Sequence, residues 1–401
     1  MIRWVLFFVI ILFIDFYVYQ SVKTVTKNKM VYVLYWFLSL AIFINFSYKI
    51  YTFNRSDGLS QSVMFAFGLL VLSISPKIIS LLILFAEDIF RIVKLAINYF
   101  SDSKVVLPSR RLFVSKIALG LAAIPFASVL YGMARGKYNY QVIKHTLFFE
   151  DLPAAFDGFK LTHISDIHCG SFDDEEKIKH GIDLINEQES DVILFTGDIV
   201  NNKAEEMNPW ISHFKSLKAN DGKFSVLGNH DYGEYVKFNS SEEKEQNFQA
   251  IQDIHPKIGF NLLLNDSIYL EKENKKIAII GVENWGTRFK KAGDLSIASS
   301  KIKKEDFKIL LSHDPSHWES EVKNHENNYQ LTLSGHTHGM QFGIEIPGFK
   351  WSPIQYVYKQ WAGVYKEFGR YINVNRGFGF LAFPGRVGIW PEITVIALKK
   401  K

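Results

Sequence analysis

The hydrophobic pattern divides this chain into an apolar first third and a longer remainder in which apolar runs alternate with polar segments. Four apolar stretches occupy the first third, at about Ile2–Tyr19, Val31–Tyr48, Ser62–Ala86 and Phe113–Tyr131. Each approaches or exceeds the roughly 18 to 20 residues that cross a bilayer as a helix. Four core helices of a soluble domain are the alternative, but segments that are apolar on every face leave little polar surface for water. We therefore expect a membrane-spanning helical region.

The third apolar stretch leaves the number of spans open. Pro76 falls in its interior and either kinks one long span or divides the stretch into two short helices. Beyond the stretch, Asp88, Arg91 and Lys94 interrupt an apolar pattern that continues to Phe100. This pattern is typical of a helix that leaves the bilayer or lies along its surface.

Positive charge predicts how the spans are oriented. The connection after the first span holds Lys23, Lys27 and Lys29, and the connection before the fourth holds Arg91, Lys94, Lys104, Arg110 and Arg111. The connection between the second and third spans holds only Lys49 and Arg55. Because basic connections stay in the cytoplasm, four spans place both termini and the rest of the chain outside it.

The segment Ser109–Lys116, just before the fourth span, resembles a twin-arginine export signal. Two ordinary basic residues beside a span are the alternative reading. Together with the charge pattern, the resemblance predicts a multi-pass protein of the bacterial inner membrane with an extracytoplasmic soluble part. Ala134–Tyr140, which contains Gly136, is typical of a linker. We expect residues 1–140 to form about four spans with this linker, and residues 141–401 to form a soluble domain.

Strands and helices alternate in the soluble part. Helices are expected at Asp174–Gln188 and around Pro209–Leu217, with a further helix start at Ser240–Glu245. Strands are expected at Phe159–Ser165, Asp191–Thr196, Lys223–Leu227, Lys276–Val282, Phe307–Leu311, Leu331–Ser334, Arg370–Val374 and Ile393–Leu398. The later strands have fewer helices between them. The pattern therefore predicts an α/β fold with a mixed sheet or two stacked sheets.

Composition narrows the classes of function. The formal net charge is +5 over 401 residues, and the basic residues are scattered. No concentrated basic stripe marks a nucleic-acid binder, so we expect no nucleic-acid partner. Cys169 is the only cysteine, which excludes an intrachain disulfide and a thiolate-rich metal site. A small buried residue is the simplest role for it.

Five short polar motifs follow predicted strands in order along the soluble part. They are Ser165-Asp166-Ile167-His168, Gly197-Asp198, Gly228-Asn229-His230-Asp231, Ser312-His313-Asp314 and Gly335-His336-Thr337-His338-Gly339. Each comes where an apolar run passes into a polar loop, which is the edge at which open α/β sheets bind ligands. Singly, each motif has an ordinary explanation as a turn, helix cap or core histidine. Five in order at strand ends are better explained by one metal site.

The donor types indicate which metals fit. In Asp166-x-His168 and His336-x-His338 the donors are two residues apart, so an extended backbone would point both members of a pair to the same side. Asp198 can bridge two cations with its two carboxylate oxygens. Asn229 adds an amide oxygen and His313 a further imidazole. Mixed nitrogen and oxygen ligation favours two divalent ions of manganese, iron or zinc over copper(I) or calcium.

The order of these motifs resembles that of the calcineurin-like metallophosphoesterases, over nearly all of the soluble part. The string Gly228 to Tyr232, the run Asn375-Arg376-Gly377 to Pro391-Glu392-Ile393-Thr394 and the membrane region resemble its membrane-anchored bacterial phosphodiesterase branch. The resemblance implies a four-layer α/β/β/α sandwich after the transmembrane helices. It also implies that Asp166, His168 and His338 bind one metal, that Asp198 bridges, that Asn229, His313 and His336 bind the second, and that His230 is the catalytic histidine beside the scissile phosphate.

Two positions depart from the pattern of the branch. Met340 stands where a second glycine is common. Asn201 stands three positions after the bridging aspartate, where many members carry an acidic residue that orients the catalytic histidine. An amide can orient His230 but stabilises its protonated form less.

The expected function is a membrane-anchored phosphodiesterase or pyrophosphatase that acts on a phospholipid or a lipid-linked substrate. An interfacial lip is one role for the aromatic residues Phe349, Trp351, Tyr356, Tyr358 and Trp361, and a core or an ordinary lid is the other. Arg376 and Arg386 are candidates for phosphate contacts or for structural ion pairs. A catalytically silent metal-binding scaffold and a membrane transport module with a regulatory domain are the competing functions. The oligomeric state is left open.

Overall fold

The computed structural model describes residues 2–100 and 110–401, which form two compact units. The first unit comprises Met1–Phe53 and Gln61–Ala134, and the second comprises Asn54–Ser60 and Arg135–Lys401. Lys104 and Ser109, which carry part of the orientation and export-signal predictions, lie outside the described residues. The connection Asn54–Ser60 therefore belongs to the same unit as the soluble part of the chain.

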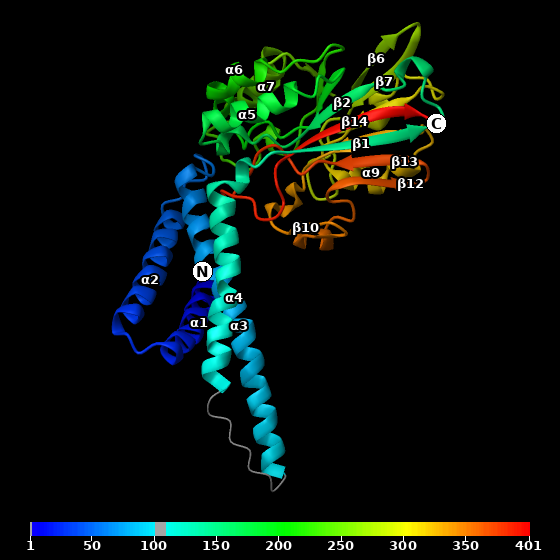
Figure 1. Ribbon diagram of the computed structural model, residues 1–401. Coiled ribbons are helices and arrows are strands. Elements are labelled where there is room, and N and C mark those ends of the chain that lie inside the picture. Colours follow the sequence, from blue (N-terminus) through cyan, green and yellow to red (C-terminus); the bar gives the residue numbers. More distant parts are fainter. Residues whose placement is uncertain (1, 101–109) are drawn as a thin grey trace. The chain divides into compact units, whose positions relative to one another are not determined.

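The first unit contains α1 (Ile2–Val25), α2 (Lys29–Tyr51), α3 (Gln61–Phe100) and α4 (Arg110–Ala134). All four are long and apolar enough to cross a membrane, which confirms the expected membrane region. α3 is a single helix of 40 residues with Pro76 in its interior, and its ribbon is continuous in Figure 1. At about 1.5 Å per residue it is roughly 60 Å long, about twice the hydrocarbon thickness of a bilayer.

Asp15 and Lys77, two charged residues inside the apolar helices, are paired with each other. Lys77 Nζ lies 2.5 Å from Asp15 Oδ1, and both side chains are largely buried. The same ammonium donates to Ser39 Oγ and Ser73 Oγ at 2.8 Å. An ion pair with added hydrogen bonds offsets the cost of charge in an apolar phase and ties α1 to α3.

The second unit contains two six-stranded sheets. The first has the order β1-β14-β2-β3-β4-β5, and the second has the order β12-β13-β9-β8-β7-β6. The strands of the first sheet are β1 (Gln141–Phe149), β14 (Glu392–Lys400), β2 (Lys160–Ile164), β3 (Val192–Phe195), β4 (Lys223–Ser225) and β5 (Asn261–Leu262). Those of the second are β12 (Gly363–Glu367), β13 (Arg370–Val374), β9 (Leu331–Ser334), β8 (Lys308–Leu311), β7 (Lys275–Gly281) and β6 (Asp266–Lys272). A separate hairpin pairs β10 (Ile344–Ile346) with β11 (Phe349–Trp351).

Side chains alternate between the two faces of each sheet, and the two sheets stack through their inner faces. Leu194 of β3 and Ile309 of β8 belong to one buried cluster between the sheets. Ile193, whose side chain points to the opposite face, packs with α5 (Glu175–Asn186), α6 (Ile211–Lys215) and α7 (Ser241–Lys257). Leu310 packs on the outer face of the second sheet with α8 (Leu295–Ala298) and α9 (Pro315–Ser320). The four layers are α/β/β/α, as predicted.

All eight predicted strands are present, and others were not predicted. β1 pairs in parallel with β14 at the edge of the first sheet, where most of its residues are partly exposed and its pattern is weak. Part of the segment that was expected to be a linker packs against the core of the second unit. Tyr138 and Tyr140 are buried in the core of the second unit, and Tyr138 Oη donates to Asp173 Oδ1 at 2.7 Å. The division of the chain at residue 140 remains a prediction.

Candidate metal centre

The five motifs meet at one edge of the sandwich. Asp166 and His168 follow β2, Asp198 follows β3, and Asn229 and His230 follow β4 in the first sheet. His313 follows β8, and His336 and His338 follow β9 in the second. β2, β3 and β4 run parallel, as do β8 and β9, so their carboxyl ends lie together. The prediction that the motifs stand at strand ends is confirmed.

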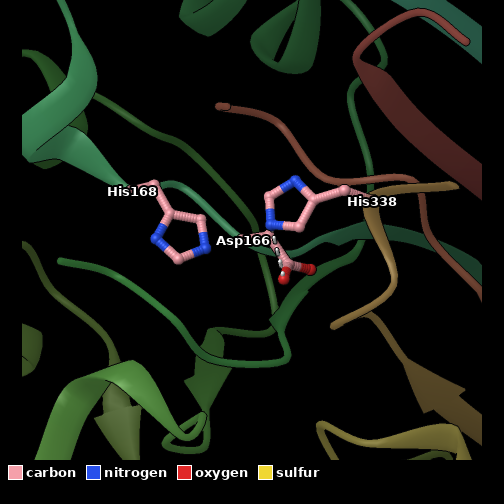
Figure 2. A group of neighbouring side chains, drawn as sticks. All are labelled: Asp166, His168 and His338. Carbon is pink, nitrogen blue, oxygen red and sulfur yellow. Dashed lines mark ion pairs between the residues drawn. The ribbon is translucent and has the colours of Figure 1, made fainter. Parts of the chain in front are cut away.

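Asp166, His168 and His338 form the first group of donors. One ligand atom from each lies within 4.8 Å of those of the others, and all three residues are buried. Figure 2 shows the His338 imidazole next to the Asp166 carboxylate, with the His168 imidazole to the left of both. His338 Nε2 lies 3.2 Å from Asp166 Oδ1. These three side chains offer one oxygen and two nitrogens to a common point.

Asp198, His313 and His336 form the second group, and Asn229 completes it. His313 Nε2 lies 3.2 Å from Asp198 Oδ2 and 3.3 Å from His336 Nδ1. Asn229 Oδ1 lies 2.8 Å from the same His336 nitrogen. Asp198 Oδ2 is also 3.4 Å from His168 Nε2 in the first group. One carboxylate therefore stands between the two groups.

The separations and the unmet polar atoms fit metal ions. For metal-to-ligand distances of about 2.1 Å, two ligands of one ion are about 3.0 to 3.4 Å apart in octahedral or tetrahedral geometry. The 3.2 to 3.4 Å separations within these groups fall in that interval. His168 is fully buried, and within the described chain neither ring nitrogen has a hydrogen-bond partner. A buried imidazole without partners is costly unless it ligates a metal.

Electrostatics also favours cations at this point. Burial would lower the pKa of His313, but the Asp198 and Asp166 carboxylates outweigh burial and raise it to about 10. The pKa of Asp198 is held well below its usual range, against the effect of burial, by His313 and His230. Two buried carboxylates thus attract positive charge to the space between the groups, and divalent cations satisfy the same demand.

The loops reach this geometry through left-handed backbone, which corrects one prediction. Asp166, His168, His336 and His338 have φ of 51°, 47°, 69° and 49°, so neither Asp-x-His nor His-x-His is extended. His336 and His338 also diverge, one into each group. Left-handed conformations in residues other than glycine store strain, which is concentrated at functional sites. The tight turns bring the donors back over the strand ends.

Two glycines make the close approach feasible. A Cβ at Gly228 would lie 2.2 Å from Asp198 Oδ1. A Cβ at Gly335 would lie 2.2 Å from Asp166 Oδ2 and nearer still to Ser165. Any larger residue at either position would displace a donor carboxylate. Met340, where a glycine is common, is itself left-handed with φ of 56° and touches no donor.

His230 is oriented by the main chain. Its Nδ1 lies 2.7 Å from the backbone oxygen of Asn201, while the Asn201 side chain bonds to Ser171. The peptide carbonyl of Asn201 therefore occupies the orienting position that was considered for the amide side chain. The Tyr235 ring lies 4.3 Å from the His230 ring, and Tyr235 Oη accepts from Asn229 Nδ2 at 2.8 Å. That bond turns the amide oxygen of Asn229 toward the second group.

Asp231, Asp314 and Tyr358 support the donors, and the sequence did not assign them this role. The Asp231 carboxylate accepts from the backbone N–H groups of Asp198 and Gly228, both at 2.8 Å, and so fixes the loop of the bridging residue. Burial raises the pKa of Asp231 to about 7, with Asp198 adding to the shift. Tyr358 Oη lies 2.8 Å from His336 Nε2 and donates to Asp314 Oδ2 at 3.3 Å.

Neither predicted arginine is free to contact phosphate. Arg376 pairs with Glu392 and, at 2.6 Å, with Glu345. Arg386 is fully buried, donates to main-chain oxygens including that of Arg376 at 2.7 Å, and lies 3.2 Å from His338 Nδ1. Both arginines hold the loop behind the first group of donors, which is the structural alternative given for them.

The predicted aromatic lip divides into exposed and buried members. Phe349 and Tyr356 are exposed, whereas Trp361 is buried with Ile389 in a small core cluster. The backbone oxygen of Trp361 accepts from Thr337 Oγ1 at 2.7 Å. For Trp361 the core alternative holds, and its backbone supports the turn that carries His336 and His338.

Comparisons with known proteins agree with this arrangement. A family model described as "Calcineurin-like phosphoesterase" matches residues 159–340, and one described as "Probable Calcineurin-like phosphoesterase, transmembrane domain" matches residues 2–137. The chain is 32% identical over 299 residues to the uncharacterized metallophosphoesterase YkuE of Bacillus subtilis, covering 73% of this chain and 98% of that protein. It is 26% identical to the phosphodiesterase YaeI of Escherichia coli, covering 72% of this chain and 99% of that protein.

One relative, from a vertebrate, is named as a transmembrane protein. The chain is 25% identical over 280 residues to the transmembrane protein with metallophosphoesterase domain of Danio rerio. The alignment covers 68% of this chain and 60% of that protein.

Proposed function

The chain belongs to the calcineurin-like metallophosphoesterase family and is a membrane phosphoester hydrolase, and from this premise we propose that it is a dinuclear phosphodiesterase or pyrophosphatase acting on a membrane lipid. The observation that carries the dinuclear part is the position of Asp198 Oδ2, 3.4 Å from His168 Nε2 and 3.2 Å from His313 Nε2. A carboxylate oxygen between two donor groups is the geometry of a bridging ligand.

Each donor has a part in this proposal. One ion would be held by Asp166, His168 and His338 and the other by Asn229, His313 and His336, and Asp198 would serve both. Manganese, iron and zinc all suit this mixed set of nitrogen and oxygen ligands. When bound, two cations activate water and offset the charge on phosphoryl oxygens during in-line attack.

His230 is the proton-transfer residue of the proposal. Because a carbonyl oxygen only accepts, the bond to Asn201 leaves the proton on Nδ1 and turns Nε2 toward the donor groups. In the imidazolium form Nε2 carries a second proton, which it would donate to the leaving-group oxygen, and the ring would then be neutral with its proton on Nδ1. Positioned proton transfer contributes typically about 10² to 10⁴-fold to such reactions.

The two competing functions have less support. A silent scaffold should lack donors, yet all seven predicted donors converge here. A transport module needs free ionisable groups in its spans, and Asp15 and Lys77 are instead bound to each other.

The soluble domain is proposed to lie outside the cytoplasm of a bacterial cell. The connection Asn54–Ser60, which has few positive charges, belongs to the same unit as this domain, and Arg55 O accepts from Lys237 N at 3.2 Å. The more basic α1–α2 connection would face the cytoplasm. A Lys401→Cys variant should react with a membrane-impermeant maleimide in spheroplasts with an intact inner membrane. Reaction only after lysis would reverse the orientation.

The central test counts metals and turnover together. The full chain, purified in detergent and freed of metal by chelation, should bind two manganese or zinc ions per chain. It should then hydrolyse bis(p-nitrophenyl) phosphate, and renewed chelation should abolish the activity. One bound ion, or activity that survives chelation, would contradict the dinuclear proposal.

A further inference from the structure

The β10–β11 hairpin is a two-stranded sheet separate from both large sheets (Figure 1). It is antiparallel, with the register Ile344 to Trp351, Glu345 to Lys350 and Ile346 to Phe349. Directly paired residues in such a ribbon point to the same face, and successive pairs alternate. One face therefore carries four apolar side chains, and the other carries Glu345 and Lys350.

The charged face of the hairpin is the one attached to the protein. Glu345 Oε1 lies 2.6 Å from Arg376 Nη2. Lys350 Nζ donates to the backbone oxygen of Ala362 and lies 4.9 Å from the centre of the Trp361 ring. This is the reverse of the usual amphipathic pattern, in which the apolar face is buried.

The apolar face is correspondingly exposed. Ile344, Ile346 and Phe349 keep 50%, 58% and 52% of their surface accessible. Among the described residues from Arg135 onward, eleven large hydrophobic side chains are exposed, and seven of them lie between Met340 and Val357. Single exposed apolar residues are ordinary, but a contiguous group of this kind marks an interaction surface.

The hairpin is joined at both ends to the metal centre. It begins six residues after His338. Ser352 Oγ, just after β11, donates to the backbone oxygen of Gly339 at 2.8 Å. Tyr358 Oη lies 2.8 Å from His336 Nε2. The segments that flank the hairpin are therefore bonded to residues of the metal centre.

A lipid bilayer is an apolar phase that is always close to this domain. The chain carries four helices able to span a membrane, and α4 ends at Ala134, directly before the second unit begins at Arg135. Within the described chain, no residue of the second unit covers the hairpin face, since its side chains remain accessible. Trp351 and Tyr356, whose indole and hydroxyl groups are 3.4 Å apart, are residue types enriched at membrane interfaces.

We propose that the apolar face of the β10–β11 hairpin docks into the interfacial region of the bilayer and presents lipid phosphoesters to the metal centre. The substrate part rests on the proposed function. The contact between the hairpin and lipid does not rest on the proposed function, and it can be measured without catalysis. The alternative occupant, a second copy of the chain packed face to face, is an outcome of the same tests.

The first experiment measures lipid contact at one residue. A Phe349→Cys variant of the full chain can be labelled selectively with a fluorophore, because the only native cysteine, Cys169, is buried. The matched control is Phe368→Cys in the β12–β13 turn, where Phe368 is 71% exposed. In nanodiscs containing lipids with a quencher high on the acyl chain, position 349 should be quenched and position 368 should not. Equal quenching at both positions, or none at 349, would overturn the proposal.

The second experiment separates lipid presentation from catalysis. The variant Ile346→Ser/Phe349→Ser is compared in nanodiscs with Ile297→Ser/Phe368→Ser, which removes equally exposed apolar groups elsewhere. Hydrolysis of a lipid phosphodiester should fall roughly tenfold or more in the hairpin variant only, because two buried apolar groups are lost from the docked state. Hydrolysis of soluble bis(p-nitrophenyl) phosphate should be unchanged in both variants.

Each other outcome has a definite meaning. An equal loss on both substrates would make the hairpin a support for the metal centre and overturn the proposal. A wild-type dimer that the hairpin variant converts to monomers would identify a second copy as the occupant, with the same effect. If the metal-loaded wild type hydrolyses neither substrate, the proposed function fails, while quenching at position 349 still decides the lipid contact.

Discussion

His230 Nδ1 lies 2.7 Å from the main-chain oxygen of Asn201. The orienting group is thus a peptide carbonyl, which every residue type supplies at this position. The carbonyl is itself held in place, because the buried Glu206 carboxylate accepts from the N–H groups of Asn201 at 2.6 Å and of Lys203 at 3.0 Å. The orientation of the catalytic histidine therefore depends on Glu206 more than on the side chain of Asn201.

An Asn201→Ala variant should keep kcat on bis(p-nitrophenyl) phosphate within about threefold of wild type, because the carbonyl that orients the imidazole is retained. The lost bond to Ser171 should instead lower stability by about 1 kcal/mol. Glu206→Ala, which frees the loop, should lower kcat by tenfold or more. A large loss of kcat in Asn201→Ala with a normal thermal midpoint would show that the amide side chain acts on His230 after all.

Measuring the bound metal distinguishes the bridging role of Asp198 from the proton-transfer role of His230. Asp198→Asn should lose bound manganese as well as activity, because the amide supplies one neutral oxygen where the two groups share a charged one. His230→Ala should retain both ions and lose about 10² to 10⁴-fold in kcat. Metal analysis of both purified variants, with circular dichroism as a control for folding, makes the comparison. Full activity in either variant would contradict the mechanism.

Tyr358 should affect metal affinity although it is not itself a donor, because its hydroxyl contacts His336. Its hydroxyl stands between His336 Nε2 and Asp314, and such bonds fix the ring orientation and basicity of a ligating histidine. Tyr358→Phe should weaken binding of one of the two ions by roughly 10- to 100-fold, measured by competition with a chelator. Tyr356→Phe is the matched control, since Tyr356 is exposed and touches no donor. Unchanged affinity in Tyr358→Phe would reduce that residue to a packing role.

Much of this site follows from local sequence signals. Apolar runs predicted β2, β3, β4, β8 and β9, and the polar residues after these runs supplied all seven donors. The two-residue spacing of Asp166 and His168 predicted that both face one site, but the extended backbone given as the reason is not what the structure shows. The pair converges through left-handed turns, and no period in the sequence distinguishes such a turn from an extended strand.

Features that depend on contacts distant along the chain were not predictable. The bond from His230 goes to a main-chain atom, which leaves no trace in residue identity. Tyr358 and Trp361 are both aromatic residues in one loop, yet one contacts a donor and the other is buried, because the hairpin between Gly343 and Ser352 folds the loop back. β1 at the sheet edge carries too little apolar pattern to stand out from a linker. These outcomes were decided by tertiary packing.

Glu206 makes stability depend on pH in a predictable direction. Burial raises the pKa of this carboxyl from 4.5 to about 7, although its backbone hydrogen bonds oppose the shift. The folded protein therefore binds a proton that the unfolded chain releases between about pH 4.5 and 7, so the contribution to stability is complete below pH 4.5 and is lost as pH rises to 7. The change amounts to roughly 3 kcal/mol for a shift of this size.

In a Glu206→Gln variant, the apparent thermal midpoint of the metal-free full chain should change less between pH 5 and pH 7.5 than in wild type, because the amide does not titrate. Other groups that titrate in this interval are present in both proteins and cancel in the comparison. Glu205→Gln, which alters the exposed neighbouring carboxylate, should keep the wild-type dependence. If Glu206→Gln retains the full wild-type slope, the buried carboxyl is already ionised at pH 5, and burial is not what governs its charge.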